Sequence, residues 1–406
     1  MAYEAISGGV TAAKGFRAAG LHCGIRGNSE KKDLALISSD VECTAAAVYT
    51  QNLVQGAPIA VTRQHLANGK ARAILCNSGN ANTCNADGEE KARKMCALIA
   101  KPLGVSPDDV IVASTGVIGQ ILPLEPIASH VDALADSLSP EGSHDAAEAI
   151  MTTDTVPKEV AVTLELGGKT VIIGGIAKGS GMIHPNMATM LSFLTTDAAI
   201  SAPMLQKALN AAVAESFNML SVDGDTSTND MLCIMASGLA GNGEITEEND
   251  DFAAFTAALT QMCISLARIM AKDGEGATKL IECSVTGAPT VESARKIAKS
   301  VICSSLVKTA MFGEDANWGR ILCAIGYAGE QINIHGVDVS ICSKAGQLDV
   351  CKNGAGIPFS EEFAKVVLAE SDIEVVVTLQ DGESAARAFG CDLTYDYVKI
   401  NGDYRT

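Results

Sequence analysis

The chain has 406 residues, of which 47% are hydrophobic and 19% are charged, and this composition excludes a disordered protein. Acidic residues outnumber basic residues by 48 to 30, which gives a formal net charge of −18. Such a charge argues against nucleic acid or an anionic membrane as the main partner, because both select basic surfaces.

Short β-branched runs alternate with Ala-rich amphipathic stretches along the chain. The predicted strands are, in chain order, 109–114, 160–166, 170–173, 331–337 and 374–379. The predicted helices are 204–216, 250–271 and 360–369. Short turns rich in Gly, Asn or Asp join most of these segments. The pattern predicts a mixed α/β fold in which helices cover the sheets.

The cysteine and histidine patterns limit the cellular context and the chemistry. The 13 cysteines include no C-x-x-C pair, and the six histidines include no H-x-x-x-H pair. We therefore expect reduced thiols and no metal site. The N-terminus has no signal-peptide pattern, and no apolar run approaches 18 residues. A soluble, cytoplasmic protein without a membrane helix is the expectation.

Residues 113–119 place small and polar side chains at the end of the strand predicted at 109–114. A Thr-Gly step at a strand end, Thr115-Gly116 here, presents a hydroxyl and a backbone N–H toward one point, as an oxyanion hole requires. A plain strand-to-helix turn explains the same residues, so the pattern alone leaves both interpretations open.

Residues 174–191 form a second Gly-rich stretch, interpreted as a loop, that contains one lysine. The stretch does not satisfy the phosphate-loop spacing G-x-x-x-x-G-K-[ST]. It does contain Ala188-Thr189, where the threonine hydroxyl could attack the preceding carbonyl and leave Thr189 as a new N-terminus. The α-amine of that threonine would then serve as the base for its own hydroxyl. Ala-Thr pairs are also common in ordinary helices and turns.

The chain resembles the self-processing ornithine acetyltransferases, bifunctional glutamate N-acetyltransferases of arginine biosynthesis. The resemblance rests on motifs in the same order over nearly the whole chain: CNSGNANTCNADG (76–88), STGVIG (114–119), MTTDT (151–155), GIAKGSGMIHPNMATML (175–191), SVDGDTSTND (221–230), AKDGEGATK (271–279), ANWGRIL (316–322) and NGDYRT (401–406).

The resemblance implies a nucleophile and a cleavage point. Thr189 matches the family nucleophile, and the bond between Ala188 and Thr189 matches the autocleavage point. Thr115 and Gly116 match the pair that stabilises the oxyanion. Cleavage would give an α chain, 1–188, and a β chain, 189–406, which the family assembles as a heterotetramer. The implied fold is a sandwich of helices that enclose β-sheets.

The resemblance also implies the substrate contacts, which are Thr152, Lys178, Thr189, Glu275, Asn401 and Thr406. The ammonium of Lys178 suits the carboxylate of an acetylated amino acid. The carboxylate of Glu275 suits the δ-ammonium of ornithine, and its flanking glycines allow a ligand to approach closely.

The implied reaction is ping-pong transfer of acetyl from N²-acetyl-L-ornithine to L-glutamate through an acetyl-Thr189 intermediate. It needs no metal and no organic cofactor. Some family members also take acetyl-CoA as the donor, and no feature of this sequence decides that point. The competing hypotheses are an aminopeptidase or amidase on a similar self-cleaving scaffold, with water as acceptor, and an uncleaved metabolite-binding protein. The joint match of the site residues argues against the second.

Four further features have less specific interpretations. The Asn-rich stretch 76–88 either lines the pocket or makes tight turns. The acidic stretch 221–230 has Thr228 where a calcium loop needs Gly, so we expect a structural loop near the site. His184 is the histidine nearest the cleavage point, and a packed loop residue is a simpler explanation than a role in processing. Trp318 is expected to anchor a core.

Overall fold

The structure, a computed structural model, describes residues 3–27, 30–184 and 190–403. The chain forms two compact units. Unit 1 comprises residues 1–179, 185–217 and 226–266, and unit 2 comprises residues 180–184, 218–225 and 267–406. The chain thus changes unit directly after Gly179.

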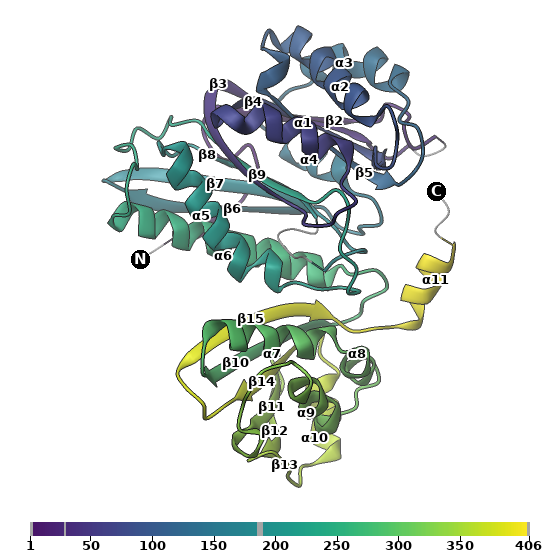
Figure 1. Cartoon of the computed structure of the whole chain (residues 1–406), viewed down its shortest axis with the longest axis vertical. Coiled ribbons are helices and arrows are strands. Elements are labelled where there is room, and N and C mark those ends of the chain that lie inside the picture. The colour runs from purple at the N-terminus through teal and green to yellow at the C-terminus, as the bar shows by residue number, and fades with distance from the viewer. Residues whose placement is uncertain (1–2, 28–29, 185–189, 404–406) are drawn as a thin grey trace. The chain divides into compact units, whose positions relative to one another are not determined.

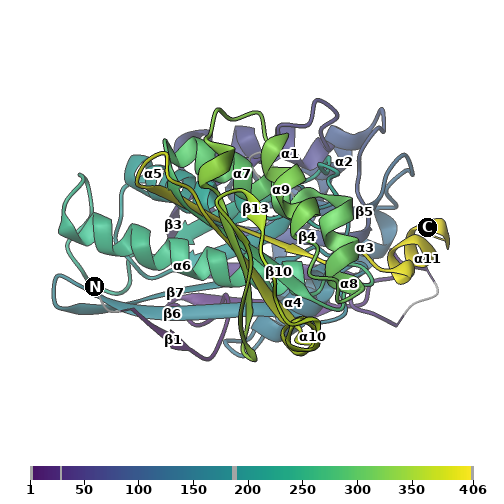
Figure 2. The same ribbon diagram turned by 90° about the horizontal axis from the view of Figure 1, so that it is seen from below.

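Unit 1 contains a large mixed sheet (Figure 1). Its described strands are β1 (Tyr3–Ile6), β2 (Phe16–Leu21), β3 (Leu34–Tyr49), β4 (Lys70–Asn80), β5 (Val110–Val117), β6 (Lys158–Leu166), β7 (Lys169–Lys178), β8 (Leu191–Thr196) and β9 (Met231–Ala236). They lie in the order β1-β6-β7-β8-β9-β3-β4-β5, and β2 pairs with β3. The pairs β8–β9 and β4–β5 are parallel. Figure 2 shows β1, β6 and β7 side by side at one edge.

Helices cover both faces of this sheet. The described helices are α1 (Ala57–His65), α2 (Gly88–Leu103), α3 (Glu125–Asp136), α4 (Ser143–Ile150), α5 (Ala202–Glu215) and α6 (Asp250–Lys272), with short 3-10 turns η1 (Leu66–Asn68), η2 (Pro107–Asp109) and η3 (Phe217–Met219). One hydrophobic core joins α4 to β3, β4, β7, β8 and β9. A second core joins α1, α2 and α3 to strands β2 to β5.

Strand β3 connects the two halves of the sheet. Its first half pairs with β4, its register shifts between Ser38 and Cys43, and its last residues pair with β9. Such an irregularity bends a strand and increases its twist. Strands β5 and β7 lie on opposite sides of β3 in the strand order, yet their ends are in contact through Thr115 and Lys178.

Unit 2 contains a smaller sheet with strands β10 (Leu280–Ala288), β11 (Asp338–Ser343), β12 (Gly346–Lys352), β13 (Ala355–Gly356), β14 (Asp372–Thr378) and β15 (Ser384–Cys391). They lie in the order β13-β12-β11-β14-β10-β15. Its helices are α7 (Val291–Cys303), α8 (Ser305–Phe312), α9 (Trp318–Gly326), α10 (Glu361–Leu368) and α11 (Tyr395–Asp403), with the 3-10 turn η4 (Ile334–Gly336). Helix α7 packs on β10 and β15 (Figure 1).

Side-chain caps fix where several of these helices begin. Thr290, Ser304, Asn317 and Ser360 each accept a hydrogen bond from a backbone N–H three residues later. Each such bond satisfies a donor that a helix start would otherwise leave unpaired. The cap at Ser360 explains why the helix predicted at 360–369 begins at Glu361.

The mixed α/β prediction is confirmed, together with four of the five predicted strands and all three predicted helices. The strand predicted at 331–337 is wrong. There the side chain of Asn333 accepts a hydrogen bond from the N–H of His335 and starts η4, which replaces a strand ladder. The loop predicted over 174–191 is also corrected in part, because residues through Lys178 belong to β7.

Helix α6 is long and apolar enough to cross a membrane when judged by length and composition alone. Its apolar face, which includes Phe255, Leu259 and Met262, is fully buried. Met262 also lies close to Gly175 of β7. These contacts are those of a helix that packs in a protein core.

Candidate active site

Thr115 and Gly116 lie within the last residues of β5, not in a turn after it. In the parallel pairing with β4, Thr115 is opposite Ser78 and Gly116 is opposite Gly79. Gly116 has a φ of 128°, and a Cβ added to it would lie 2.3 Å from the carbonyl carbon of Gly79. The backbone at this point therefore requires glycine.

Lys178 is the last residue of β7 and stands opposite Leu191, the first residue of β8. Its side chain is buried, and its Nζ donates to Oγ1 of Thr115 at 3.5 Å. Burial lowers the pKa of Lys178, and the nearby carboxylate of Asp154 opposes that change. The structure thus brings two of the predicted site residues into contact across the unit 1 sheet.

Asp154 anchors the backbone directly after Lys178 and the backbone of Thr152. Its Oδ1 accepts hydrogen bonds from the N–H of Gly179 at 2.6 Å and from Nζ of Lys158 at 2.7 Å. Its Oδ2 accepts from the N–H of Thr152 at 3.0 Å. Burial alone would raise the pKa of Asp154, but the ammonium groups of Lys178 and Lys158 hold it well below its usual range. Thr152, which is half-buried, therefore shares an anchor with the end of β7.

Asn229 ties the start of β9 to the end of β5. Its Nδ2 donates to the carbonyl oxygens of Ala81 at 2.6 Å and of Ser114 at 2.9 Å, and its Oδ1 accepts from Thr83 at 2.5 Å. The next residue, Asp230, is fully buried. Burial raises the pKa of its carboxyl well above the usual value. Asp154, Lys158, Asn229 and Asp230 are not among the site residues predicted from the sequence.

The Asn-rich stretch 76–88 begins in the last residues of β4 and passes through turns to the start of α2. Nδ2 of Asn77 donates to the carbonyl oxygen of Asn80, Oδ1 of Asn80 accepts from the N–H of Asn82, and Nδ2 of Asn82 donates to the carbonyl oxygen of Gly88. These local bonds favour the turn interpretation of this stretch over pocket lining.

Unit 2 contains the other two described site residues, Glu275 and Asn401. Nδ2 of Asn401 in α11 donates to Oε2 of Glu275 at 2.7 Å. The N–H of Glu275 donates to the carbonyl oxygen of Ser180 at 2.8 Å. A Cβ added to Gly181 would lie 2.3 Å from the carboxyl carbon of Glu275, so a side chain at 181 would displace that carboxylate.

The surroundings of Glu275 are acidic. Burial raises the pKa of the Tyr397 hydroxyl, and the carboxylates of Asp223, Glu275 and Asp225 raise it further. Three carboxylates around one phenol favour a cation at this place. Asp223 also accepts hydrogen bonds from the N–H groups of Met182 at 2.6 Å and Ile183 at 2.9 Å.

His184 is packed in unit 2. Its Nδ1 lies 3.0 Å from the hydroxyl of Ser221. Burial lowers the pKa of His184 to about 4, with the ammonium of Lys299 adding to the effect, so the ring is neutral at pH 7. This environment favours the packed-residue interpretation. Trp318 is half-buried at the start of α9 and packs against Gly356 of β13.

Three of the predicted site residues, Ala188, Thr189 and Thr406, lie outside the described residues. The described part of the chain holds no group of three or more His, Cys, Asp or Glu side chains placed to bind a metal. All 13 cysteines are free thiols.

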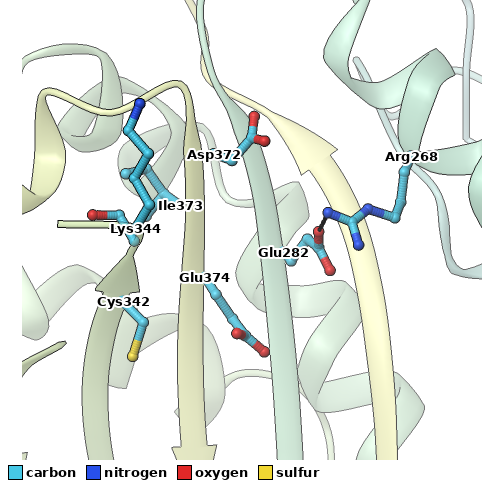
Figure 3. A pocket seen from close by; sticks show the side chains of 8 residues that line it. Arg268, Glu282, Cys342, Lys344, Asp372, Ile373 and Glu374 are labelled. Atoms are coloured by element: carbon cyan, nitrogen blue, oxygen red, sulfur yellow. Dashed lines mark ion pairs between the residues drawn. The ribbon is translucent and has the colours of Figure 1, made fainter. Parts of the chain in front are cut away.

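Unit 2 also has a shallow pocket between β14, β11 and the end of α6 (Figure 3). Charged side chains of this pocket form ion pairs. Nη2 of Arg268 lies 2.7 Å from Oε1 of Glu282, and Oδ1 of Asp372 lies 2.6 Å from Nζ of Lys272. Of the predicted site residues that the structure describes, none lines this pocket.

Fold and site together define a mixed α/β protein with a buried, ammonium-bearing cluster where the strands of its larger sheet end. The family model described as ArgJ family matches residues 17–406. The chain is 53% identical over 405 residues to the arginine biosynthesis bifunctional protein ArgJ of Symbiobacterium thermophilum. The aligned region covers 99% of this chain and 100% of that protein. The chain therefore belongs to the ArgJ family, and the resemblance seen in its motifs is confirmed.

Two solved structures are also similar. The crystal structure of the arginine biosynthesis bifunctional protein argJ from Bacillus halodurans is 50% identical, with a TM-score of 0.49, over 52% of this chain and 97% of that one. The ornithine acetyltransferase of Mycobacterium tuberculosis, solved in complex with ornithine, is 38% identical, with a TM-score of 0.43, over 46% of this chain and 100% of that one.

Proposed function

We propose that this protein is a cytoplasmic glutamate N-acetyltransferase of arginine biosynthesis that moves an acetyl group from N²-acetyl-L-ornithine to L-glutamate. Full-length similarity to proteins named for arginine biosynthesis supports the pathway. The observation that carries the chemistry is the 3.5 Å contact between Nζ of Lys178 and Oγ1 of Thr115. It puts an ammonium, suited to a carboxylate, beside a donor suited to an oxyanion.

The proposed first half-reaction forms an ester. The hydroxyl oxygen of Thr189 attacks the acetyl carbonyl, Thr115 and Gly116 stabilise the oxyanion, and the C–N bond to ornithine breaks. The α-amine of Thr189 takes the hydroxyl proton and returns it to the departing amine. In the second half-reaction the amine of glutamate attacks the ester, and the threonine hydroxyl is restored.

The proposed substrate contacts divide by charge. Lys178, with Thr152 held beside it through Asp154, binds the carboxylate of the acetylated amino acid. Glu275, held by Asn401, binds the δ-ammonium of ornithine in the acidic surroundings of Tyr397. Thr189 and Thr406 are the remaining proposed substrate contacts. No metal or organic cofactor takes part in these steps.

We propose that the nucleophile arises by self-cleavage between Ala188 and Thr189, which gives chains 1–188 and 189–406 that assemble as a heterotetramer. The Thr189→Ala variant lacks the attacking hydroxyl and should remain one 406-residue chain on denaturing electrophoresis. Thr189→Ser keeps the hydroxyl and should still cleave. Efficient cleavage of Thr189→Ala would remove Thr189 from the mechanism.

The acyl-enzyme gives the direct test of the transfer. Incubation of the cleaved protein with acetylornithine alone should add one acetyl group to the 189–406 chain, as measured by mass spectrometry. Glutamate should discharge it as N-acetylglutamate, with parallel double-reciprocal lines. Free acetate in place of N-acetylglutamate would indicate an amidase. Acetyl-CoA as the only donor tests the second activity that the relatives' name, bifunctional, suggests.

Lys178 has a matched control on its own strand. Lys178→Met should raise the KM for acetylornithine, because it removes the proposed partner of the substrate carboxylate. Lys169→Met alters the exposed first residue of β7 and should leave KM unchanged. Equal KM values for both variants would contradict the proposed role of Lys178.

A further inference from the structure

The titratable groups that face Lys178 come from several elements. They are Asp154 in the loop before β6, Lys158 at the start of β6, Asp230 before β9 and Cys76 in β4. All four side chains are buried. Any charge among them is therefore weakly screened by solvent, and the balance of charge in the cluster depends on these groups.

Burial acts against negative charge at two of the groups that face Lys178. It raises the pKa values of Asp230 and Cys76, because a carboxylate or a thiolate is poorly solvated there. Asp154, whose pKa is held low, accepts a hydrogen bond from Lys158 at 2.7 Å. Lys158 and Lys178 therefore share one carboxylate. A carboxylate substrate at Lys178 would supply a second negative charge.

We propose that Asp154 and Lys158 are positioning residues for Lys178: Asp154 fixes the end of β7 and faces Lys178 with its carboxylate, and Lys158 shares that carboxylate so that Lys178 stays available to an anionic substrate. The inference rests on the proposed function only for the identity of that anion. Asp154 fixes the backbone through the N–H of Gly179, the residue directly after Lys178. Asp154 also fixes the backbone of Thr152, by accepting a hydrogen bond from its N–H.

The two residues act on Lys178 with opposite sign. Asp154→Asn keeps the size of the side chain and removes its charge, so the ammonium form of Lys178 is less stabilised. Lys158→Met removes the competing ammonium, so Asp154 stabilises Lys178 alone. A neighbouring charge typically shifts a buried group by about one pH unit or more.

The first measurement does not depend on catalysis. Labelling with deuterated acetic anhydride over a pH series, followed by peptide mass spectrometry, gives the pH at which Lys178 becomes reactive. That midpoint should fall by about one unit or more in Asp154→Asn and rise by a similar amount in Lys158→Met. Lys169, exposed on the same strand, is the internal reference and should keep its midpoint in both variants.

The second measurement is the KM for acetylornithine against pH. Asp154→Asn should raise KM at pH 8 and recover toward the parent value at lower pH, whereas Lys158→Met should raise KM across the range. Unchanged labelling midpoints in both variants, or midpoints that move the same way, would overturn the inference. Opposite shifts without any effect on KM would leave the positioning role intact and contradict the proposed role of Lys178 in substrate binding. If Asp154→Asn fails to fold, Lys158→Met alone tests the inference. Its labelling midpoint should rise, and an unchanged or lower midpoint would overturn the inference.

Discussion

Gly116→Ala is the substitution for which the geometry of the site gives the clearest expectation. The residue has a φ of 128°, a conformation that side chains rarely adopt, and its added Cβ would lie 2.3 Å from the carbonyl carbon of Gly79 and 2.6 Å from the backbone nitrogen of Asn80. Both atoms belong to β4, the strand paired with β5, so relief of the clash requires the two strands to separate.

The expected cost has two parts. The unfavourable backbone conformation costs about 1–3 kcal/mol, and forcing an extra carbon into a packed site costs about 1–3 kcal/mol. Gly119→Ala provides a matched control, because Gly119 has a φ of 81° and nothing within 4 Å of its added Cβ. The control should show the backbone part alone. At roughly 2–4 °C per kcal/mol, Gly116→Ala should lower Tm by on the order of 10 °C and the control by a few degrees.

Calorimetry of the two variants and the parent protein measures these shifts, and the acetyl-transfer assay measures the loss of activity beside them. Gly116→Ala should lose most transfer activity, since the strand end that carries the proposed oxyanion donors is displaced. Equal Tm values for the two variants would refute the argument, because the contact with β4 would then have no energetic consequence.

Two further substitutions have defined outcomes. Glu275→Gln should raise the KM for acetylornithine by about 10-fold or more, a charged hydrogen bond being worth about 1.5–3 kcal/mol, and should affect a neutral-side-chain N-acetyl donor less. Equal KM changes for both donors would assign Glu275 a structural role. The pKa of His184 is lowered to about 4, whereas an unfolded histidine titrates near 6.5, so its contribution to stability is present above about pH 6.5 and is lost as pH falls toward 4. Tm of the parent protein should therefore fall more steeply between pH 6.5 and 4 than Tm of His184→Gln, and parallel Tm curves would contradict this environment.

Local pattern was enough to predict much of the fold. The β-branched run that becomes β5 and the long amphipathic run that becomes α6 both formed at the predicted places, although β5 continues to Val117. The strand predicted at 331–337 failed because a single side chain, Asn333, offers the backbone a competing hydrogen bond. Propensity averaged over a window does not register such a bond.

The candidate site was predictable only where motifs carried it. Thr115 was a candidate from its place in a Thr-Gly step at a strand end, and Lys178 was assigned from a family resemblance. Their contact depends on pairing across four intervening strands, β8, β9, β3 and β4. Asp154 and Asp230 have no local signature, because an acidic residue in a polar loop looks like a solvated one. What distinguishes them is burial, which is a property of the folded chain.

The bent strand β3 also sets the order in which this site can be made. β3 has its β4 partner by residue 80, but its second partner, β9, ends at Ala236, far later in the chain. Asn229 and Asp230 precede β9 directly and belong to the same late segment. More than half of the chain must therefore be synthesised on the ribosome before β9 can join β8 to β3 and Thr115 can meet Lys178. The charged cluster is consequently a late product of translation, and the growing polypeptide carries its reactive groups unassembled until then.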